Sequence, residues 1–536
     1  MGRQSTVLKG IAQGVFYLTI LALIVSDSVS AGISHDENQF IAPGQLLAYH
    51  GLVPYVDYPY THMPYATIFY AFSALASDFD FLAGRLLSCL AWLGCILLIV
   101  AISRALRGGI NAPARSETSW KQLLWEFALV YVLVNHGPVL FILRTALNHS
   151  LATLFALLAA WFLVRGMRLQ ATAPRAAFFN GACIAAAGLT RFNFASLGVV
   201  FLVCWLIYAL WLGLARTRSV IMRYLTGGLI ASVPVIVLMA LAPRAFYYSN
   251  LVYIRLNTVY YEQLLRRSGM DLASKLHDFV YGILVQPLDL LLYALLLYTA
   301  ATSIVHLLKR RSALDLARLG IAGTAFTLWL TALAPTPGLL QYFAAPVPFL
   351  FVLLLAVEVH TVRFDKPVRA LGVLLVLVAA ATSIRLTNPA DEFAVLAKSS
   401  KWIPVELHQL ARQLQNHVRA EGRILTLQPM IPLEAGYDIY SFTAAGPFNW
   451  RTSLLLTPER RREYGVTSPR ELPALLADSP PDAILTGFEA PNAGFERQQL
   501  GGLETPFSDY ALGHSYEAVA LSPPFWSRGL TLWIRP

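Results

Sequence analysis

The sequence predicts a polytopic α-helical membrane protein with a soluble α/β domain at its C-terminal end. Of its 536 residues, 56% are hydrophobic and only 13% are charged, whereas about a quarter of the residues in a typical soluble domain are charged. Apolar stretches of roughly 20 residues, the length that an α-helix needs to cross the hydrocarbon core, recur as far as position 386. Beyond that position the composition becomes that of a soluble domain.

The apolar stretches correspond to about eleven membrane-spanning helices. We favour an uncleaved first span, although Lys9, the apolar run and Ser28-Val29-Ser30-Ala31 also fit a cleavable signal peptide. The stretches at 150–165 and 176–190 are short for a span. The predicted spans are residues 10–31, 81–104, 123–142, 150–165, 176–190, 194–214, 226–242, 286–307, 316–334, 338–358 and 369–386.

Basic residues are distributed unevenly over the loops between these spans. With a cytoplasmic N-terminus, every inner loop contains Arg or Lys, whereas the outer loop from Asp27 to Asp80 has neither. An excess of Lys and Arg on the cytoplasmic side is the usual pattern, and it accounts for much of the net charge of +10. The basic balance therefore does not indicate a nucleic-acid partner. An odd number of spans places the C-terminal domain outside.

The chain is predicted to divide into a membrane domain, residues 1–386, and a C-terminal domain, residues 387–536. Strands that alternate with helices in the second part predict a small α/β domain. The sequence has no Walker-type phosphate loop, no dinucleotide-binding fingerprint and no cysteine spacing typical of a metal site or a disulfide framework. The predicted elements are a helix at Val405–Val418, a strand at Arg423–Leu427, a helix at Pro469–Ala477 and strands at Ala483–Thr486, Tyr516–Leu521 and Leu530–Ile534.

The first outer loop, residues 32–80, holds the most informative polar residues. His35-Asp36-Glu37 follows the first span, and Asp57-Tyr58 and His62 come later. The two adjacent carboxylates could be solvated turn residues that end the span. Alternatively, they face a polar site in which one of them acts as general base for an acceptor hydroxyl that attacks an anomeric carbon. The other carboxylate, with His35 or His62, could ligate a divalent metal cation or position substrate hydroxyls.

Five short motifs occur in this loop in the order Asp36-Glu37, Gly51, Pro54-Tyr55, Asp57-Tyr58 and His62-Met63-Pro64. In this order the loop resembles the first periplasmic loop of GT-C-type glycosyltransferases. It is most similar to the bacterial branch that contains the aminoarabinose and lipid-A sugar transferases and the protein mannosyltransferases. Two later segments also resemble that superfamily, namely Gly188-Leu189-Thr190-Arg191-Phe192 and the region of Pro335-Thr336-Pro337, Gln341-Tyr342 and Pro346.

The resemblance implies a GT-C-like fold and a polyprenyl-phosphate-linked monosaccharide as donor. The sugar would be transferred, with inversion, to a lipid, polysaccharide or protein acceptor on the periplasmic side of a bacterial inner membrane. Asp36 would be the catalytic carboxylate, with Glu37 beside it. Many members carry a second acidic residue in the next outer loop, where this chain has Asn148-His149. Asn148 cannot act as a base, and His149 could do so only if it is suitably placed, so Asp36 is the principal expectation.

A donor phosphate needs cationic partners on the outer side, where Lys and Arg are otherwise scarce. Each outer Arg could instead interact with lipid headgroups. The tyrosines of the outer loop 243–285 could form an aromatic belt at the membrane surface or line a groove for sugars. The predicted substrate-binding residues are Asp57, Tyr58, His62, Arg144, His149, Arg191, Arg255, Arg266, Arg267 and Tyr342.

Two other function classes remain open from the sequence alone. A transporter or flippase of a lipid-linked sugar would also be polytopic, but inverted repeats and broken spans in corresponding halves are not evident. A non-catalytic assembly protein would tolerate the loss of the Asp36 carboxylate. In the C-terminal part, Gly446–Arg451 could pack over the opening of the active site and recognise the acceptor, or could be a structural cap.

Overall fold

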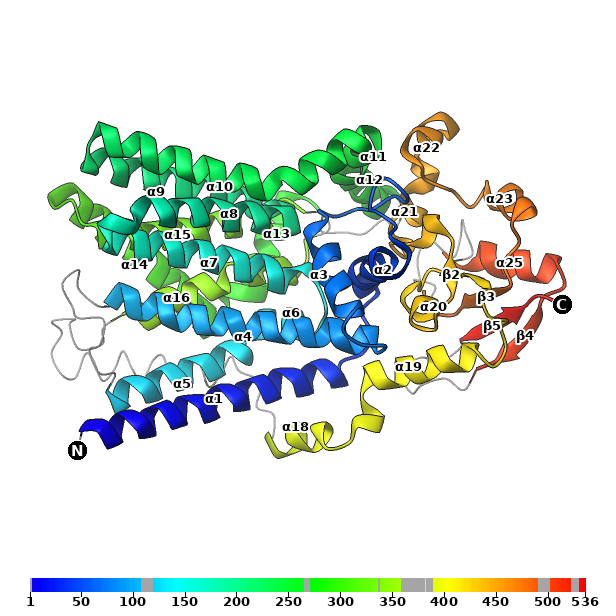
Figure 1. Ribbon diagram of the computed structural model, residues 1–536, viewed down its shortest axis with the longest axis horizontal. Helices are drawn as coiled ribbons and strands as arrows, with labels where there is room; N and C mark the ends of the chain where they lie inside the picture. The colour runs from blue at the N-terminus through cyan, green and yellow to red at the C-terminus, as the bar shows by residue number, and fades with distance from the viewer. Residues whose placement is uncertain are drawn as a thin grey trace.

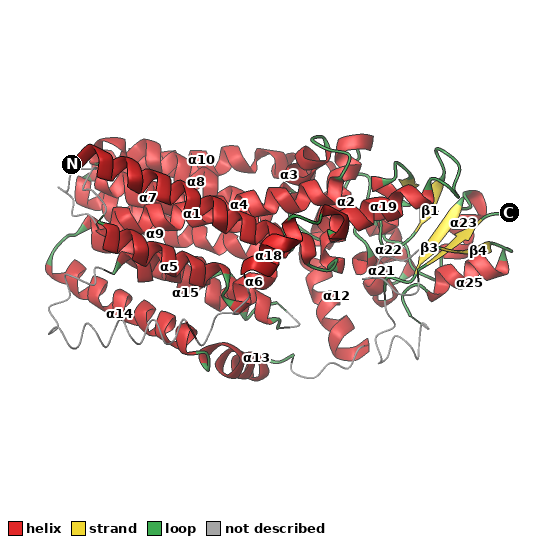
Figure 2. Cartoon of the chain, turned by 90° about the horizontal axis from the view of Figure 1, so that it is seen from below, coloured by secondary structure: helices red, strands yellow, loops and turns green. Residues whose placement is uncertain are grey.

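A computed structural model describes residues 2–107, 119–264, 270–335, 338–357, 381, 389–489, 502–521 and 530–536. Long helices lie side by side in one half of the molecule, and the strands gather in the other half (Figures 1 and 2). The two ends of the chain lie at opposite ends of the long axis (Figure 1). The first outer loop sits between the helical bundle and the C-terminal region.

The bundle confirms a multi-pass membrane protein. Seven of the described helices are long and apolar enough to cross a membrane, and the predicted count of eleven is not confirmed. The bundle helices are α1 (Gly2–Ser30), α4 (Asp80–Arg107), α5 (Trp120–Val134), α6 (Gly137–Leu143), α7 (Asn148–Arg168), α8 (Ala173–Thr190), α9 (Leu197–Leu212), α10 (Leu214–Leu241), α14 (Pro287–Lys309), α15 (Ala313–Ala332) and α16 (Val347–Ala356).

Four predicted spans need comment. The span expected at 123–142 is interrupted between α5 and α6, where Pro138 lies at the start of α6 and cannot continue the helix of α5. The stretches at 150–165 and 176–190, short in the sequence, are extended by flanking residues into the longer helices α7 and α8. All of the span at 369–386 except residue 381 lies outside the described residues.

Helices α8 and α10 cross at very short distance because each of them presents a glycine to the backbone of the other helix. A Cβ atom on Gly181 would lie 2.0 Å from the carbonyl oxygen of Tyr224, and one on Gly227 would lie 2.0 Å from that of Phe178. Small residues at such crossings are typical of helices packed in membranes, where close backbone contact contributes dispersion energy. Arg191 follows directly after the end of α8.

The end of the bundle next to the C-terminal region carries short helices that surround the first loop. Gly44 on α2 lets α3 pass close by, since a Cβ atom there would lie 2.7 Å from the backbone of Tyr70. The short elements are α2 (His35–His50), α3 (Tyr65–Ala74), α11 (Pro243–Tyr247), α12 (Tyr253–Val259), α13 (Leu272–Phe279), η3 (Tyr248–Val252), η4 (Tyr260–Leu264), η5 (Val280–Leu284) and η6 (Leu340–Ala344).

The C-terminal region contains a five-stranded mixed sheet and several short helices. The strand order is β2-β1-β3-β5-β4, with β1 parallel to β2 and β3, and β5 antiparallel to β3 and β4. The strands are β1 (Arg423–Leu425), β2 (Asp438–Ile439), β3 (Ala483–Thr486), β4 (Glu517–Ala520) and β5 (Thr531–Ile534). The helices are α18 (Pro389–Leu396), α19 (Ile403–Leu414), α20 (Met430–Glu434), α21 (Pro447–Thr452), α22 (Pro458–Tyr464), α23 (Leu472–Asp478) and α25 (Thr505–Gly513).

The C-terminal region and the first outer loop share one hydrophobic core. Phe40 and Tyr60 of the loop pack in the same buried cluster as Leu407 and Met430 of the C-terminal region. The amide of Asn38 donates a hydrogen bond of 2.6 Å to Gln428 across this contact. The contact therefore holds the C-terminal region against the first turn of α2, although the predicted boundary at 386–387 lies outside the described residues.

Candidate active site

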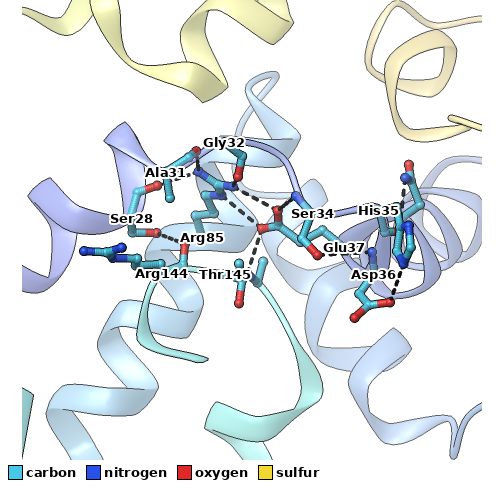
Figure 3. A network of polar contacts seen from close by, with 12 residues as sticks. Ser28, Ala31, Gly32, Ser34, His35, Asp36, Glu37, Arg85, Arg144 and Thr145 are labelled. Atoms are coloured by element: carbon cyan, nitrogen blue, oxygen red, sulfur yellow. Dashed lines mark hydrogen bonds and ion pairs between the residues drawn. The ribbon is translucent and has the colours of Figure 1, made fainter. Parts of the chain in front are cut away.

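The first turn of α2 positions the two carboxylates that the sequence singles out. Ser34 is the N-cap, and Glu37 three residues later completes a capping box by accepting a hydrogen bond from the Ser34 N–H at 2.9 Å. Because successive residues of a helix point about 100° apart, Asp36 and Glu37 face different sides. Figure 3 shows Glu37 directed toward Arg85 and Asp36 directed away from it.

Glu37 is fully occupied by structural contacts. Its two oxygens accept hydrogen bonds from Arg85 Nε at 3.0 Å and Nη2 at 2.9 Å, and both side chains are 0% exposed. The N–H of Ala146 donates to the same carboxylate at 2.8 Å. The Arg85 guanidinium also donates to backbone carbonyls between α1 and α2, including that of Gly32 at 2.8 Å. Glu37 thus joins α1, α2, α4 and the start of α7, and no oxygen is left to face a substrate.

Asp36 is in a different environment. Its side chain is 26% exposed, and its Oδ1 accepts from His35 Nε2 at 3.2 Å and from Gln39 Nε2 at 3.3 Å. Burial opposes its ionisation, but the hydrogen bond from His35 and the positive charges of His35 and Arg451 outweigh it. The pKa of Asp36 is therefore lower than usual. Asp36 is an ionised carboxylate at neutral pH, and its Oδ2 has no hydrogen-bond partner among the described residues.

Arg191 approaches Asp36 from the bundle. Its Nη1 donates to Asn148 Oδ1 at 2.9 Å and to His149 Nδ1 at 3.3 Å, both at the first turn of α7. The guanidinium lies over the ring of Tyr342 on η6, 5.6 Å from the ring centroid. Burial lowers the pKa of Arg191, and the negative charge of Asp36 partly opposes this effect. Asn148, in the position where a second acid was expected, orients this arginine.

A second arginine, Arg451 on α21, reaches the same place from the C-terminal region. It is 7% exposed, and its Nη2 donates to Asn257 Oδ1 at 2.7 Å. The rings of Tyr260, Tyr261 and Phe448 surround its guanidinium at 4.5–5.3 Å, an arrangement that favours the cation. Its Nε is buried and has no hydrogen-bond partner within the described residues. Sequence reasoning singled out the segment Gly446–Arg451 but did not place Arg451 at the site.

His62 completes the group on the loop side. Its Nε2 lies 2.6 Å from Gln39 Oε1, and because that oxygen can only accept, Nε2 carries the proton. Burial, reinforced by the charge of Arg191, lowers the pKa of His62 to about 4. Gln39 thus links a neutral His62 to Asp36, and the lone pair on His62 Nδ1 is left as an acceptor.

Other predicted site residues are not brought to this group. Arg144 forms an ion pair with Asp27 at 2.9 Å and so fastens α6 to α1. Asp57 is exposed and its carboxylate accepts from the Val53 N–H at 2.6 Å within the loop. Tyr58 is 2% exposed in the loop core, and Arg255 is exposed on α12. Arg266 and Arg267 lie outside the described residues.

A metal site formed by His35, Asp36, Glu37 and His62 does not fit this geometry. Glu37 faces Arg85, and His62 Nε2 is bonded to Gln39. Among the residues that the structure describes, no three His, Cys, Asp or Glu side chains lie close enough together to hold a metal ion. The arrangement is instead a carboxylate, a neutral imidazole and two guanidinium groups. The guanidinium groups suit an anionic ligand, and the carboxylate can accept a proton from a ligand.

Comparisons with known proteins bear on the fold. No protein-family model and no curated protein matches the sequence. Two crystal structures of ArnT from Cupriavidus metallidurans are similar over nearly the whole chain, each at 12% identity. The form bound to undecaprenyl phosphate has a TM-score of 0.57 and covers 97% of this chain and 98% of that one. The apo form has a TM-score of 0.54 and covers 98% of both. The chain therefore has the fold of the GT-C-type membrane glycosyltransferases, as the motifs of its first loop predicted.

Proposed function

We propose that the protein transfers a monosaccharide from a polyprenyl-phosphate carrier to an acceptor on the periplasmic side of a bacterial inner membrane. One observation carries this proposal. Three distant segments bring an ionised carboxylate, Asp36, together with two guanidinium groups, Arg191 and Arg451, at the end of the bundle next to the C-terminal region. The similar ArnT structure holds undecaprenyl phosphate, which belongs to the proposed class of carrier.

The two arginines suit the carrier phosphate. Guanidinium groups bind phosphate oxygens through paired N–H donors. Within the described residues, the hydrogen bonds of Arg191 use Nη1 alone and those of Arg451 use Nη2 alone, so donors remain on both side chains. The buried Nε of Arg451 is a donor without a partner, and such a group is costly unless a ligand or water satisfies it.

Asp36 suits the acceptor. Its free Oδ2 would take the proton of the acceptor hydroxyl as that oxygen attacks the anomeric carbon. The bond between the anomeric carbon and the phosphate oxygen then breaks, and the pair of electrons stays on the phosphate. Arg191 and Arg451 would stabilise the charge that develops there, as preorganised donors do in other transfer reactions. A direct displacement of this kind inverts the anomeric centre.

The location of Arg191 suits a lipid-borne donor. It follows the end of α8, lies beside the start of α7 and rests on Tyr342 of η6, which precedes α16. A carrier whose tail lies in the bilayer would thus present its phosphate at the level where these helices end. The C-terminal region would cover the same place from outside, through Arg451.

The proposal is tested with purified protein in lipid nanodiscs. A panel of radiolabelled polyprenyl-phosphate sugars is supplied with an extract of envelope lipids and glycans, and transfer is followed for the wild type, Asp36→Asn and Asp57→Asn. We expect transfer by the wild type and by Asp57→Asn, and loss in Asp36→Asn at an unchanged unfolding temperature. Equal transfer by wild type and Asp36→Asn would remove Asp36 from the reaction. Carrier movement across the bilayer without transfer would favour a flippase.

A further inference from the structure

A third carboxylate reaches the site from the C-terminal sheet. After β3 ends at Thr486, the chain continues through Gly487 and Phe488 to Glu489, whose Oε2 lies 3.9 Å from His35 Nδ1. The other nitrogen of that ring, Nε2, lies 3.2 Å from Asp36 Oδ1. One imidazole therefore bridges two carboxylates, one from the membrane-side loop and one from the C-terminal region.

Glu489 is held in this place by its own neighbours. Glu504 Oε2 accepts hydrogen bonds from the N–H of Gly487 at 2.8 Å and from that of Glu489 at 3.3 Å. The Glu489 side chain is 13% exposed, and its Oε1 is buried without a hydrogen-bond partner within the described residues. The ring of Phe448 meets His35 edge-on, 5.5 Å between centroids. These contacts fix both members of the His35–Glu489 pair.

We propose that Glu489 is a positioning residue of the transfer site: its charge holds a doubly protonated His35 against Asp36, so that Asp36 stays ionised and ready to take the proton of the acceptor. This inference rests on the proposed function. It makes the site depend on the docked C-terminal region for a negative charge as well as for Arg451.

The proton can be followed from atom to atom. Transfer of the sugar leaves the acceptor proton on Asp36. Both nitrogens of the His35 imidazolium already carry protons, Nε2 toward Asp36 and Nδ1 toward Glu489, and His35 keeps them. Asp36 passes the acceptor proton to water from its part-exposed carboxyl group and is a carboxylate again. No reactant other than water is needed.

The electrostatics favour the imidazolium form of His35 and the ionised form of Asp36. The charged groups that face His35 and Glu489 are Asp36, Arg451 and, behind Glu489, Glu504. Burial lowers the pKa of His35, but the hydrogen bond and charge of Asp36 with the charge of Glu489 raise it overall. Burial also raises the pKa of Glu489, whereas that of Asp36 is lowered. His35 therefore keeps both of its protons, and Asp36 returns to the carboxylate after each transfer.

Two variants with the same backbone test the role of the Glu489 charge. Glu489→Gln removes it and Glu489→Asp keeps it, with Glu517→Gln on the exposed strand β4 as the matched control. For each protein we would measure the transfer rate from pH 5 to pH 10 and the titration of the His35 imidazole by NMR, assigned with a His35→Asn variant.

We expect Glu489→Gln to slow transfer by up to roughly 10²-fold, the lower end of acid–base contributions. His35 should also lose its proton at lower pH, so the alkaline limb of the rate profile and the His35 titration should both shift downward. Glu489→Asp should retain part of both, and Glu517→Gln should match the wild type.

An unchanged alkaline limb together with an unchanged His35 titration in Glu489→Gln would overturn the inference. If Glu489→Gln does not fold, His35→Asn decides, because it must slow transfer and abolish the same alkaline limb. A wild type that transfers no sugar would refute the proposed function. In that case the NMR titration would still establish or exclude the coupling between His35 and Glu489.

Discussion

The two sides of the first turn of α2 show how one pair of neighbouring carboxylates is divided between structure and chemistry. On one side, Glu37 and Arg85 are both 0% exposed and satisfy each other with paired hydrogen bonds. On the other side, Asp36 is 26% exposed and borders Arg191, Arg451 and His62 without using all of its oxygens. Buried groups that are fully paired maintain a fold, and part-exposed groups held ionised are available for reaction.

The largest expected effect comes from removing the negative charge of Asp36, on the part-exposed side of the turn. Asp36→Asn keeps the shape of the side chain but cannot accept the acceptor proton, so transfer should fall by roughly 10²–10⁴-fold. The unfolding temperature should stay close to that of the wild type, because no buried ion pair is lost. Rates from initial-velocity assays and unfolding curves from the same preparations check both statements. A variant that unfolds early with normal specific activity would reverse the assignment.

Glu37→Gln should produce the opposite pattern. It leaves the Arg85 guanidinium buried without its counter-ion, and breaking a buried pair by removing one partner costs about 3–5 kcal/mol. We therefore expect a clear fall in the unfolding temperature, with transfer per folded molecule changed far less than in Asp36→Asn. If Glu37→Gln were as stable as the wild type but inactive, Glu37 would have to act on the substrate.

A comparison of Arg451 with Arg255 tests whether the arginine beside Asp36 has a specific role. Arg451→Lys keeps a charge but loses the planar donors and part of the contact with three aromatic rings. It should lower kcat/KM by roughly 10²-fold, the lower end of the effect of removing one preorganised donor. Arg255→Lys, at an exposed position on α12, should stay within about twofold. Equal effects of the two substitutions on kcat/KM would argue against a specific role for Arg451.

Glu434 provides a comparison with Glu37, because it is equally buried but is paired with His408 and not with an arginine. Its side chain is 0% exposed beside His408, with N···O at 2.9 Å, and burial raises its pKa to about 7. A raised pKa means that its contribution to stability is complete below about pH 4.5 and is lost as the pH rises through about 7.

The wild type should therefore lose stability on the order of 2 kcal/mol between pH 5 and pH 8 through this group. Glu434→Gln, which stays neutral, should show a smaller loss over the same range. Thermal unfolding of both proteins at the two pH values is the measurement. Parallel pH dependence in wild type and variant would show that Glu434 does not titrate in this range.

Much of the fold could be predicted because it follows local patterns. Long apolar runs predicted the bundle helices, and the strand predicted at Ala483–Thr486 is β3. Strand β2, with two residues, is too short to leave a periodic pattern. The break between α5 and α6 could have been predicted from Gly137-Pro138, but the apolar run continues through it and concealed it.

The site was only partly predictable, because most of it depends on contacts between distant segments. Arg451 and Glu489 reach Asp36 through the docking of the C-terminal region, and no local pattern marks either of them. The role of Glu37 did have a local signal. Ser34-His35-Asp36-Glu37 has the spacing of a capping box, which predicts that Glu37 turns back toward the N-cap. The interpretation of Asp36 and Glu37 as a catalytic pair did not take this capping-box spacing into account.

The most direct test of the central claim is sugar transfer per folded molecule, measured side by side for wild type, Asp36→Asn and Glu37→Gln in nanodiscs. Labelled product is counted against the amount of folded protein from unfolding curves. We predict that the wild type transfers sugar from a polyprenyl-phosphate donor, that Glu37→Gln retains most of this activity per folded molecule, and that Asp36→Asn is folded and inactive. Full activity in Asp36→Asn would contradict the claim that this carboxylate performs the reaction.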